Sequence, residues 1–167
     1  MPRSDDRLYD LTRDLVTSMG YALVTVEDSV EGGRRILRFI IDHPRGITLG
    51  DCETASREIG YLLESDPGVE GRYSLEVSSP GLDRELSSER EYAHFAGRDA
   101  RFVLREPRDG QAVLLATVLG AVPGGVRVRL ANGEETVLPF RSISRARLTD
   151  RSSTDTDSDG KQAPRAR

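Results

Sequence analysis

Hydrophobic residues in the first part of the chain repeat with the periods of helices and strands. One stripe has helical spacing and consists of Leu8, Leu11, Leu15 and Met19. It predicts a first helix that is capped by Ser4 and ends at Gly20. A second apolar stripe predicts a helix over residues 51–64, and its members are Cys52, Ala55, Ile59, Leu62 and Leu63.

Three strands are expected around these helices. Residues 21–27 and 34–42 read as a hairpin whose turn contains Gly32 and Gly33, and residues 73–78 alternate apolar with polar side chains. A short helix is expected over residues 89–95. The order helix, strand, strand, helix, strand predicts a small sheet with both long helices on one face.

The pattern changes after Gly97, where short strand-like runs follow one another with Gly, Pro and Asn turns between them. The runs cover residues 98–105, 112–119, 126–130, 135–138 and 144–148. Five short strands in so few residues predict a small β-barrel. The expected organisation is therefore α+β, with an N-terminal α/β domain over residues 1–92, a C-terminal barrel over residues 93–150, and a disordered tail over residues 151–167.

Charge separates the two expected domains. Residues 1–92 hold 11 Arg and 19 Asp and Glu, a net charge of −8, whereas residues 93–150 hold 9 Arg and 6 acids, a net charge of +3. An acidic half should attract basic proteins and repel phosphates, and a basic half should do the reverse. Two surfaces with different partners are therefore expected.

Catalysis and cofactor chemistry find little support in the sequence. The two histidines, His43 and His94, read as loop or surface residues, and the single cysteine, Cys52, falls on the apolar face of a helix. The chain has no phosphate loop, nucleophile elbow or zinc-binding helix motif. We expect no metal, cofactor or small-molecule substrate, and no membrane segment, because no apolar run approaches about 18 residues. A single thiol and the absence of a signal sequence favour the cytoplasm.

The most specific stretch follows the third strand and runs Ser78, Ser79, Pro80, Gly81, Leu82, Asp83, Arg84. Pro80 and Gly81 suit the second and third positions of a type II turn, because the first requires a fixed φ and the second a positive φ. Asp83 and Arg84 are placed to pair across that turn. Two compatible interpretations follow: a rigid corner between the domains, or a contact with a partner.

With Val77 in front, these residues resemble the signature of the RimP family, ribosome maturation factors that serve the small ribosomal subunit. The family usually has Pro after the Arg, where this chain has Glu85. Further similarity lies at residues 48–52, 97–98 and 138–148. The resemblance implies an α/β domain followed by an Sm-like barrel. It also implies a non-catalytic factor, expected to be a monomer, that binds the immature 30S particle and one of its basic ribosomal proteins.

The strand pattern suggests where rRNA would bind. Arg101 and Arg105 alternate with apolar residues in one run, as do Arg127 and Arg129 in another, so all four should face outward and be available to phosphates. The alternative is a merely solubilising surface. Two other functions stay open: an Sm-like regulator acting on free RNA, and a hydrolase using Ser78 or Ser79 with His94 and Asp83.

Overall fold

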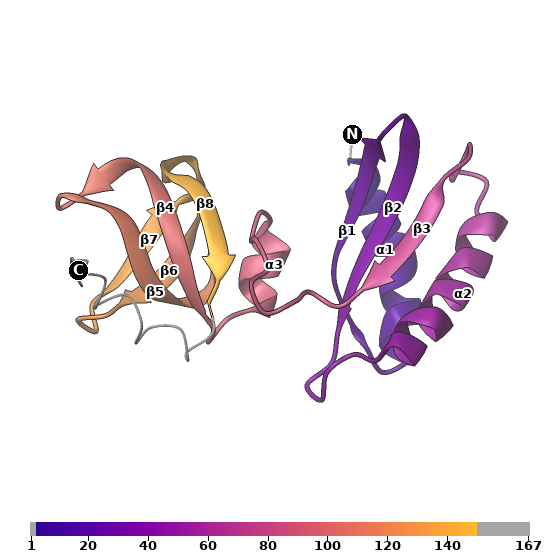
Figure 1. Cartoon of the computed structure of the whole chain (residues 1–167), viewed down its shortest axis with the longest axis horizontal. Helices are drawn as coiled ribbons and strands as arrows, with labels where there is room; N and C mark the ends of the chain where they lie inside the picture. Colours follow the sequence, from indigo (N-terminus) through magenta and orange to yellow (C-terminus); the bar gives the residue numbers. More distant parts are fainter. Residues whose placement is uncertain (1–2, 150–167) are drawn as a thin grey trace, which may run out of the picture. The chain divides into compact units, whose positions relative to one another are not determined.

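The computed structural model of the chain describes residues 3–149, and it divides into two compact units between Gly81 and Leu82 (Figure 1). The sequence-based prediction placed the end of the first domain at residue 92, about eleven residues further along the chain. Residues 84–86 pair with a strand of the second unit: the Leu86 amide donates to the Ala146 carbonyl, and the Leu148 amide donates to the Arg84 carbonyl. The predicted disordered tail lies outside the described residues.

The first unit is a three-stranded sheet with two helices on one face (Figure 1). Its elements are α1 Ser4–Ser18, β1 Ala22–Glu31, β2 Arg34–Asp42, α2 Leu49–Ser65 and β3 Ser74–Ser78. The strand order is β1-β2-β3, with β1 and β2 antiparallel and β2 and β3 parallel. The parallel pair follows from α2, which carries the chain back to the starting end of the sheet. The predicted α/β layer is confirmed.

Local signals explain most ends of these elements. Gly32 and Gly33 both have positive φ and form the two-residue turn between Glu31 and Arg34, which pair directly. Thr48 and Asp51 form a capping box at the start of α2, since each side chain accepts from the other residue's amide. The predicted cap of α1 is wrong: Arg3 is the N-cap without a side-chain bond, and Ser4 lies within the helix and donates to Asp28.

The core of the first unit lies between the sheet and the helices. The buried residues of α1 are Leu8, Thr12 and Val16, whereas Leu11 and Leu15 of the predicted stripe lie beside them and are only partly buried. Thr12 is accommodated because its hydroxyl donates to the Leu8 carbonyl at 2.8 Å. The other buried members are Leu23, Val26, Leu37, Phe39, Ile41, Ala55, Ile59 and Leu63.

The second unit is a short helix followed by a five-stranded antiparallel sheet. Its elements are α3 Glu89–His94, β4 Asp99–Arg108, β5 Gln111–Val122, β6 Gly125–Leu130, β7 Glu135–Pro139, the 3-10 helix Phe140–Ser142 and β8 Ile143–Leu148. The order is β7-β6-β5-β4-β8. All five predicted strands are present, but β7 and β8 are not paired with each other, so the sheet is not closed as the barrel prediction required.

Candidate functional site: the connecting motif and the arginine face

The signature stretch spans the boundary between the units. Ser78 is the last residue of β3 in the first unit, and Leu82 is the first residue of the second. Gly81 has φ 76, so the positive φ predicted for this position is confirmed. A side chain here would be strained, since only glycine adopts this backbone region freely.

The last residue of the stretch is anchored inside the second unit. The guanidinium of Arg84 donates to the carboxylate of Glu91, with nitrogen–oxygen distances of 2.7 and 2.8 Å, and the Glu91 side chain is 1% exposed. The same carboxylate accepts from the amides of Ser87 and Ser88, at 2.9 and 3.0 Å. Glu91 is therefore a fully partnered buried charge that fixes the chain between the motif and α3.

This anchor differs from the expected pairing of Asp83 with Arg84. Asp83 instead accepts from Arg147 on β8, at 3.4 Å. Sequence reasoning missed Glu91 because it lies seven residues beyond Arg84, on the first turns of a helix where an acid is ordinarily a capping residue. The sequence signal that could have located Glu91 is the capping box that it forms with Ser88.

The middle of the stretch is accessible. Leu82 is 68% exposed, and Ser79, Gly81 and Asp83 are also exposed, whereas Ser78 and Pro80 are half-buried. An exposed large apolar side chain between two anchored ends is available for contact with a partner.

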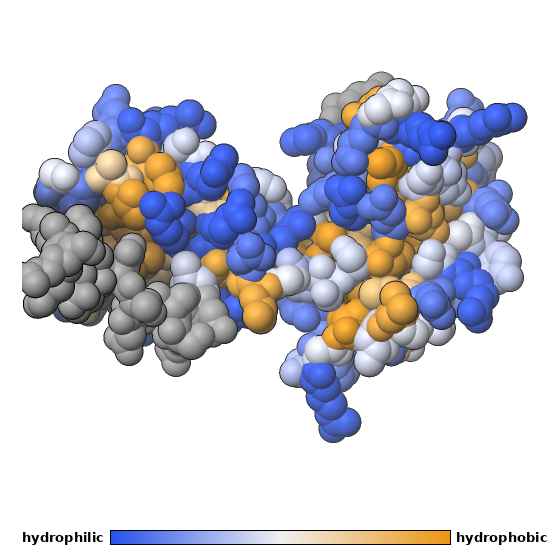
Figure 2. All heavy atoms as spheres, viewed as in Figure 1, coloured by the Kyte–Doolittle hydropathy of each residue, from blue (hydrophilic) through white to orange (hydrophobic). Residues whose placement is uncertain are grey.

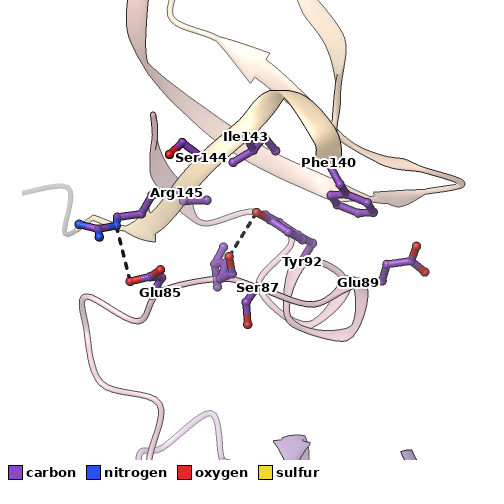
Figure 3. Close-up of a pocket in the computed structure, with 10 residues that line it drawn as sticks. Glu85, Ser87, Glu89, Tyr92, Phe140, Ile143, Ser144 and Arg145 are labelled. Atoms are coloured by element: carbon purple, nitrogen blue, oxygen red, sulfur yellow. Dashed lines mark hydrogen bonds and ion pairs between the residues drawn. The ribbon is translucent and has the colours of Figure 1, made fainter. Parts of the chain in front are cut away.

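A cavity of about 320 Å³ adjoins the anchored end of the motif, within the second unit (Figure 3). The ring of Tyr92 stacks on Phe140 with centroids 5.5 Å apart, and its hydroxyl donates to the Leu86 carbonyl at 3.4 Å. Burial raises the pKa of Tyr92 to about 12. Tyr92 is therefore a neutral donor that helps hold the segment after the motif.

All four arginines expected to face outward are exposed. Arg101 and Arg105 flank buried Phe102 and Leu104 on β4, and Arg127 and Arg129 alternate with buried residues on β6. Among residues 3–149, Arg101, Arg105 and Arg127 have no carboxylate within ion-pair distance. Arg129 does: its guanidinium lies 2.9 Å from the Glu135 carboxylate.

Strand register divides these arginines into two groups. Arg101 pairs across the strands with Arg147 of β8 on one side and with Leu115 of β5 on the other. Val103 pairs with Arg145 of β8 in the next row. The strands β4 and β8 thus form one arginine face, defined by Arg101, Arg105, Arg145 and Arg147, while β5 separates β6 from it.

Arg145 and Arg147 were missed by the sequence reasoning, since their position beside β4 depends on a pairing of distant segments. Like charges directly opposite each other destabilise a sheet, so the Arg101–Arg147 pair is poorly explained by folding alone. Part of its charge is offset by Asp83 and Glu85, which lie within 3.4 Å of Arg147. The remaining positive charge is available to an anionic ligand.

Ser78 and His94 belong to different units, and Cys52 is half-buried with its pKa raised by burial, which disfavours the thiolate. Within residues 3–149 no cluster of His, Cys, Asp and Glu is placed to hold a metal ion. In the same part of the chain, no helix has the length and apolar character needed to cross a bilayer.

Residues 11–83 match the family model described as the RimP N-terminal domain. The chain carries the N-terminal domain of the RimP family. The family assignment made from the motif is therefore confirmed, and the match extends from α1 through the exposed part of the motif. RimP proteins are ribosome maturation factors, and the family match implies a ribosome-related partner in general.

The RimP match also clarifies the two parts of the motif. The match ends at Asp83, one residue before Arg84 enters its buried pair with Glu91. The RimP domain therefore corresponds to the first unit with its connecting segment, and the arginine face lies beyond the matched residues.

Proposed function

We propose that this chain assists assembly of the small (30S) ribosomal subunit by binding the immature particle, as a cytoplasmic monomer that catalyses no reaction. The observation that carries the proposal is the RimP N-terminal domain over residues 11–83, which includes the signature motif. The proposal needs no cofactor.

The first unit is proposed to bind a basic ribosomal protein. With the boundary after Gly81, it holds 9 Arg against 15 Asp and Glu. Two of its arginines are already neutralised internally: the Arg35 guanidinium lies 2.7 Å from the Asp28 carboxylate, and Arg38 reaches Glu27, Glu31 and Glu76. The unpaired charge left on this unit is therefore mainly negative, which favours a cationic partner.

The second unit is proposed to be Sm-like and to contact rRNA through the arginine face. A short helix before five antiparallel strands supports an Sm-like arrangement, although the hydrogen-bonded sheet stays open. Arg101 and Arg105 support a phosphate contact, since they are exposed and lack carboxylate partners among residues 3–149. Arg127 and Arg129 form a secondary part of this surface.

The signature stretch, residues 78–84, is proposed to act both as the connection between the units and as a contact with the particle. Its anchored Arg84 supports the first role, and exposed Leu82 supports the second. The two roles are compatible because different residues serve them.

Sedimentation tests the proposal directly. The full chain is mixed with purified immature and mature small subunits and centrifuged through a sucrose gradient. We expect comigration with the small subunit and preference for the immature particle, and we expect Leu82→Ser to weaken it. Absence of the chain from small-subunit fractions of both kinds would reject the proposed function.

The arginine face also favours one alternative, an Sm-like regulator that binds free RNA. The positions of two aromatic side chains argue against this alternative. Phe102 is fully buried and the ring of Phe140 is stacked on Tyr92, so neither ring is available to stack on an RNA base. Filter binding with generic single-stranded RNA separates the two functions. Binding as tight as that to the particle would favour the regulator.

A further inference from the structure

The strand β3 is a sheet edge with no bulge, Pro or covering segment among the described residues. It pairs only with β2, in unbroken register from Ser74 to Ser78, and it contains neither Pro nor Lys. Its outward backbone amides and carbonyls have no backbone partner elsewhere in residues 3–149. An edge of this kind is a template for another strand.

The other three sheet edges of the described chain are protected. β1 has a bulge near Leu23, whose carbonyl also accepts from the Tyr9 hydroxyl. β7 ends in Pro139, and β8 is covered by residues 84–86 over its second half. The contrast singles out β3, whose edge has no bulge, Pro or covering segment in the described chain.

A groove of about 620 Å³ runs between β3 and α2 (Figure 2 shows apolar atoms there among hydrophilic ones). Leu75 and Val77 line it from the strand, and Leu49 and Cys52 line it from the helix. Leu49 is 77% exposed, although it is a large apolar residue at the first position of a helix. The groove therefore offers apolar contacts beside unpaired backbone groups.

Charge indicates what kind of segment fits. Glu53 and Arg57 line the groove on α2, and Glu76 of β3 shares the cation Arg38 with Glu27 and Glu31. The unit as a whole has six more acids than arginines. The capping box at the start of α2 satisfies the amides of Thr48 and Asp51. A segment with cationic side chains therefore fits better than an acidic one.

We propose that an extended basic segment of a partner protein adds to β3 as a fourth strand. Its alternate apolar side chains enter the groove against Leu49, Cys52, Leu75 and Val77, and its basic side chains, which point to the opposite face of the sheet, lie toward Glu76 and the other acids around Arg38. The inference rests on the proposed function for the source of this segment, a basic ribosomal protein.

Backbone methylation distinguishes strand addition from simple charge attraction. The probe is a fluorescein-labelled peptide of alternating lysine and valine, nine residues long, used with the full-length chain in fluorescence anisotropy. Two derivatives carry N-methyl groups on every valine or on every lysine. Because successive amides of a strand point to opposite edges, we expect one derivative to bind about tenfold more weakly or worse, and the other to bind like the parent. Equal binding of the two derivatives overturns the proposal.

Matched variants on α2 locate the site. Leu49→Ala should weaken binding of the parent peptide about fivefold, because it removes apolar contact, whereas Tyr61→Ala should change it less than about twofold. Tyr61 is 60% exposed on the same helix and lies outside the groove. Glu53→Lys and Glu64→Lys are the matched variants that test charge, since Glu53 lines the groove and Glu64 lies outside it on the same helix. We expect the larger loss of peptide affinity for Glu53→Lys. Equal effects within either pair overturn the proposal.

Cys52 provides a built-in reporter, since it is the chain's single cysteine and lines the groove. Saturating peptide should slow alkylation of Cys52 by iodoacetamide at least about fivefold, and an unchanged rate counts against the site. These peptide measurements use no ribosomal particle. Their failure therefore leaves the sedimentation test of the proposed function intact, and failure of sedimentation leaves the peptide result intact.

Discussion

The two units differ in the charge that remains on their surfaces after their arginines are paired. In the first unit Arg7, Arg35 and Arg38 each reach a carboxylate, so that acidic surface remains after pairing. In the second unit Arg84 is held by buried Glu91, and Arg129, Arg145 and Arg147 reach surface carboxylates, while Arg101 and Arg105 on the outer face have no carboxylate partner in the described chain. Net charge alone would not distinguish these cases. The pairing of each side chain decides which charge a partner meets.

The largest expected effect concerns the buried pair of the second unit. Glu91→Ala leaves the Arg84 guanidinium and the amides of Ser87 and Ser88 without their acceptor, so we expect a loss of about 3–5 kcal/mol in the free energy of unfolding. Urea unfolding followed by tyrosine fluorescence measures it. Glu89→Ala, on an exposed position of the same helix, should change stability by less than about 0.5 kcal/mol. Similar losses for the two variants would show that the pair does not hold the fold.

The boundary between the units is tested at Gly81. Gly81→Val forces a β-branched residue into positive φ, at a cost of about 1–3 kcal/mol. Thermal unfolding detects this as a lowered Tm. Gly50→Ala is the control, because the added methyl group would meet only the Thr48 hydroxyl at 3.8 Å. An unchanged Tm for Gly81→Val would mean that the folded chain does not require a positive φ at this residue.

The outer arginines should differ in how much they contribute to the salt dependence of binding to the small subunit. Replacing Arg101 and Arg105 by Ala should lower the log–log salt slope of binding to the small subunit by about 1.4–1.8, a loss of two phosphate contacts. Replacing Arg127 and Arg129 should lower it less, because Arg129 is paired with Glu135. Sedimentation at several salt concentrations measures both. Equal slopes for parent and Arg101/Arg105 variant would contradict an RNA contact at the arginine face.

The smallest expected effect concerns the internal pairing of the first unit. The Arg35 guanidinium lowers the pKa of Asp28, so the pair stabilises the folded state above pH about 4 and this contribution is lost as pH falls through the lowered pKa. Asp28→Asn should cost roughly 1 kcal/mol at pH 7 and make stability less dependent on pH between 7 and 3. Urea midpoints at several pH values measure this. Asp14→Asn, at a side chain 92% exposed, should match the parent.

Local patterns were sufficient for elements whose signals are close in sequence. The strand β2 was predicted over residues 34–42 and is found at Arg34–Asp42, because alternation and the Gly32-Gly33 turn both lie within the segment. The outward direction of Arg101 and Arg127 likewise follows from strand alternation alone. The motif identified the family, since its residues are contiguous.

Tertiary structure decided the features that join distant segments. The ion pair of Arg84 with Glu91 joins the end of the motif to α3 of the second unit, and the register of β4 with β8 places Arg147 opposite Arg101. The sheet order also left β3 as an unprotected edge beside α2. Sequence periodicity determines which face of its own element a side chain occupies, but it carries no information on which element lies opposite. That choice depends on the packing and hydrogen bonding of the folded chain.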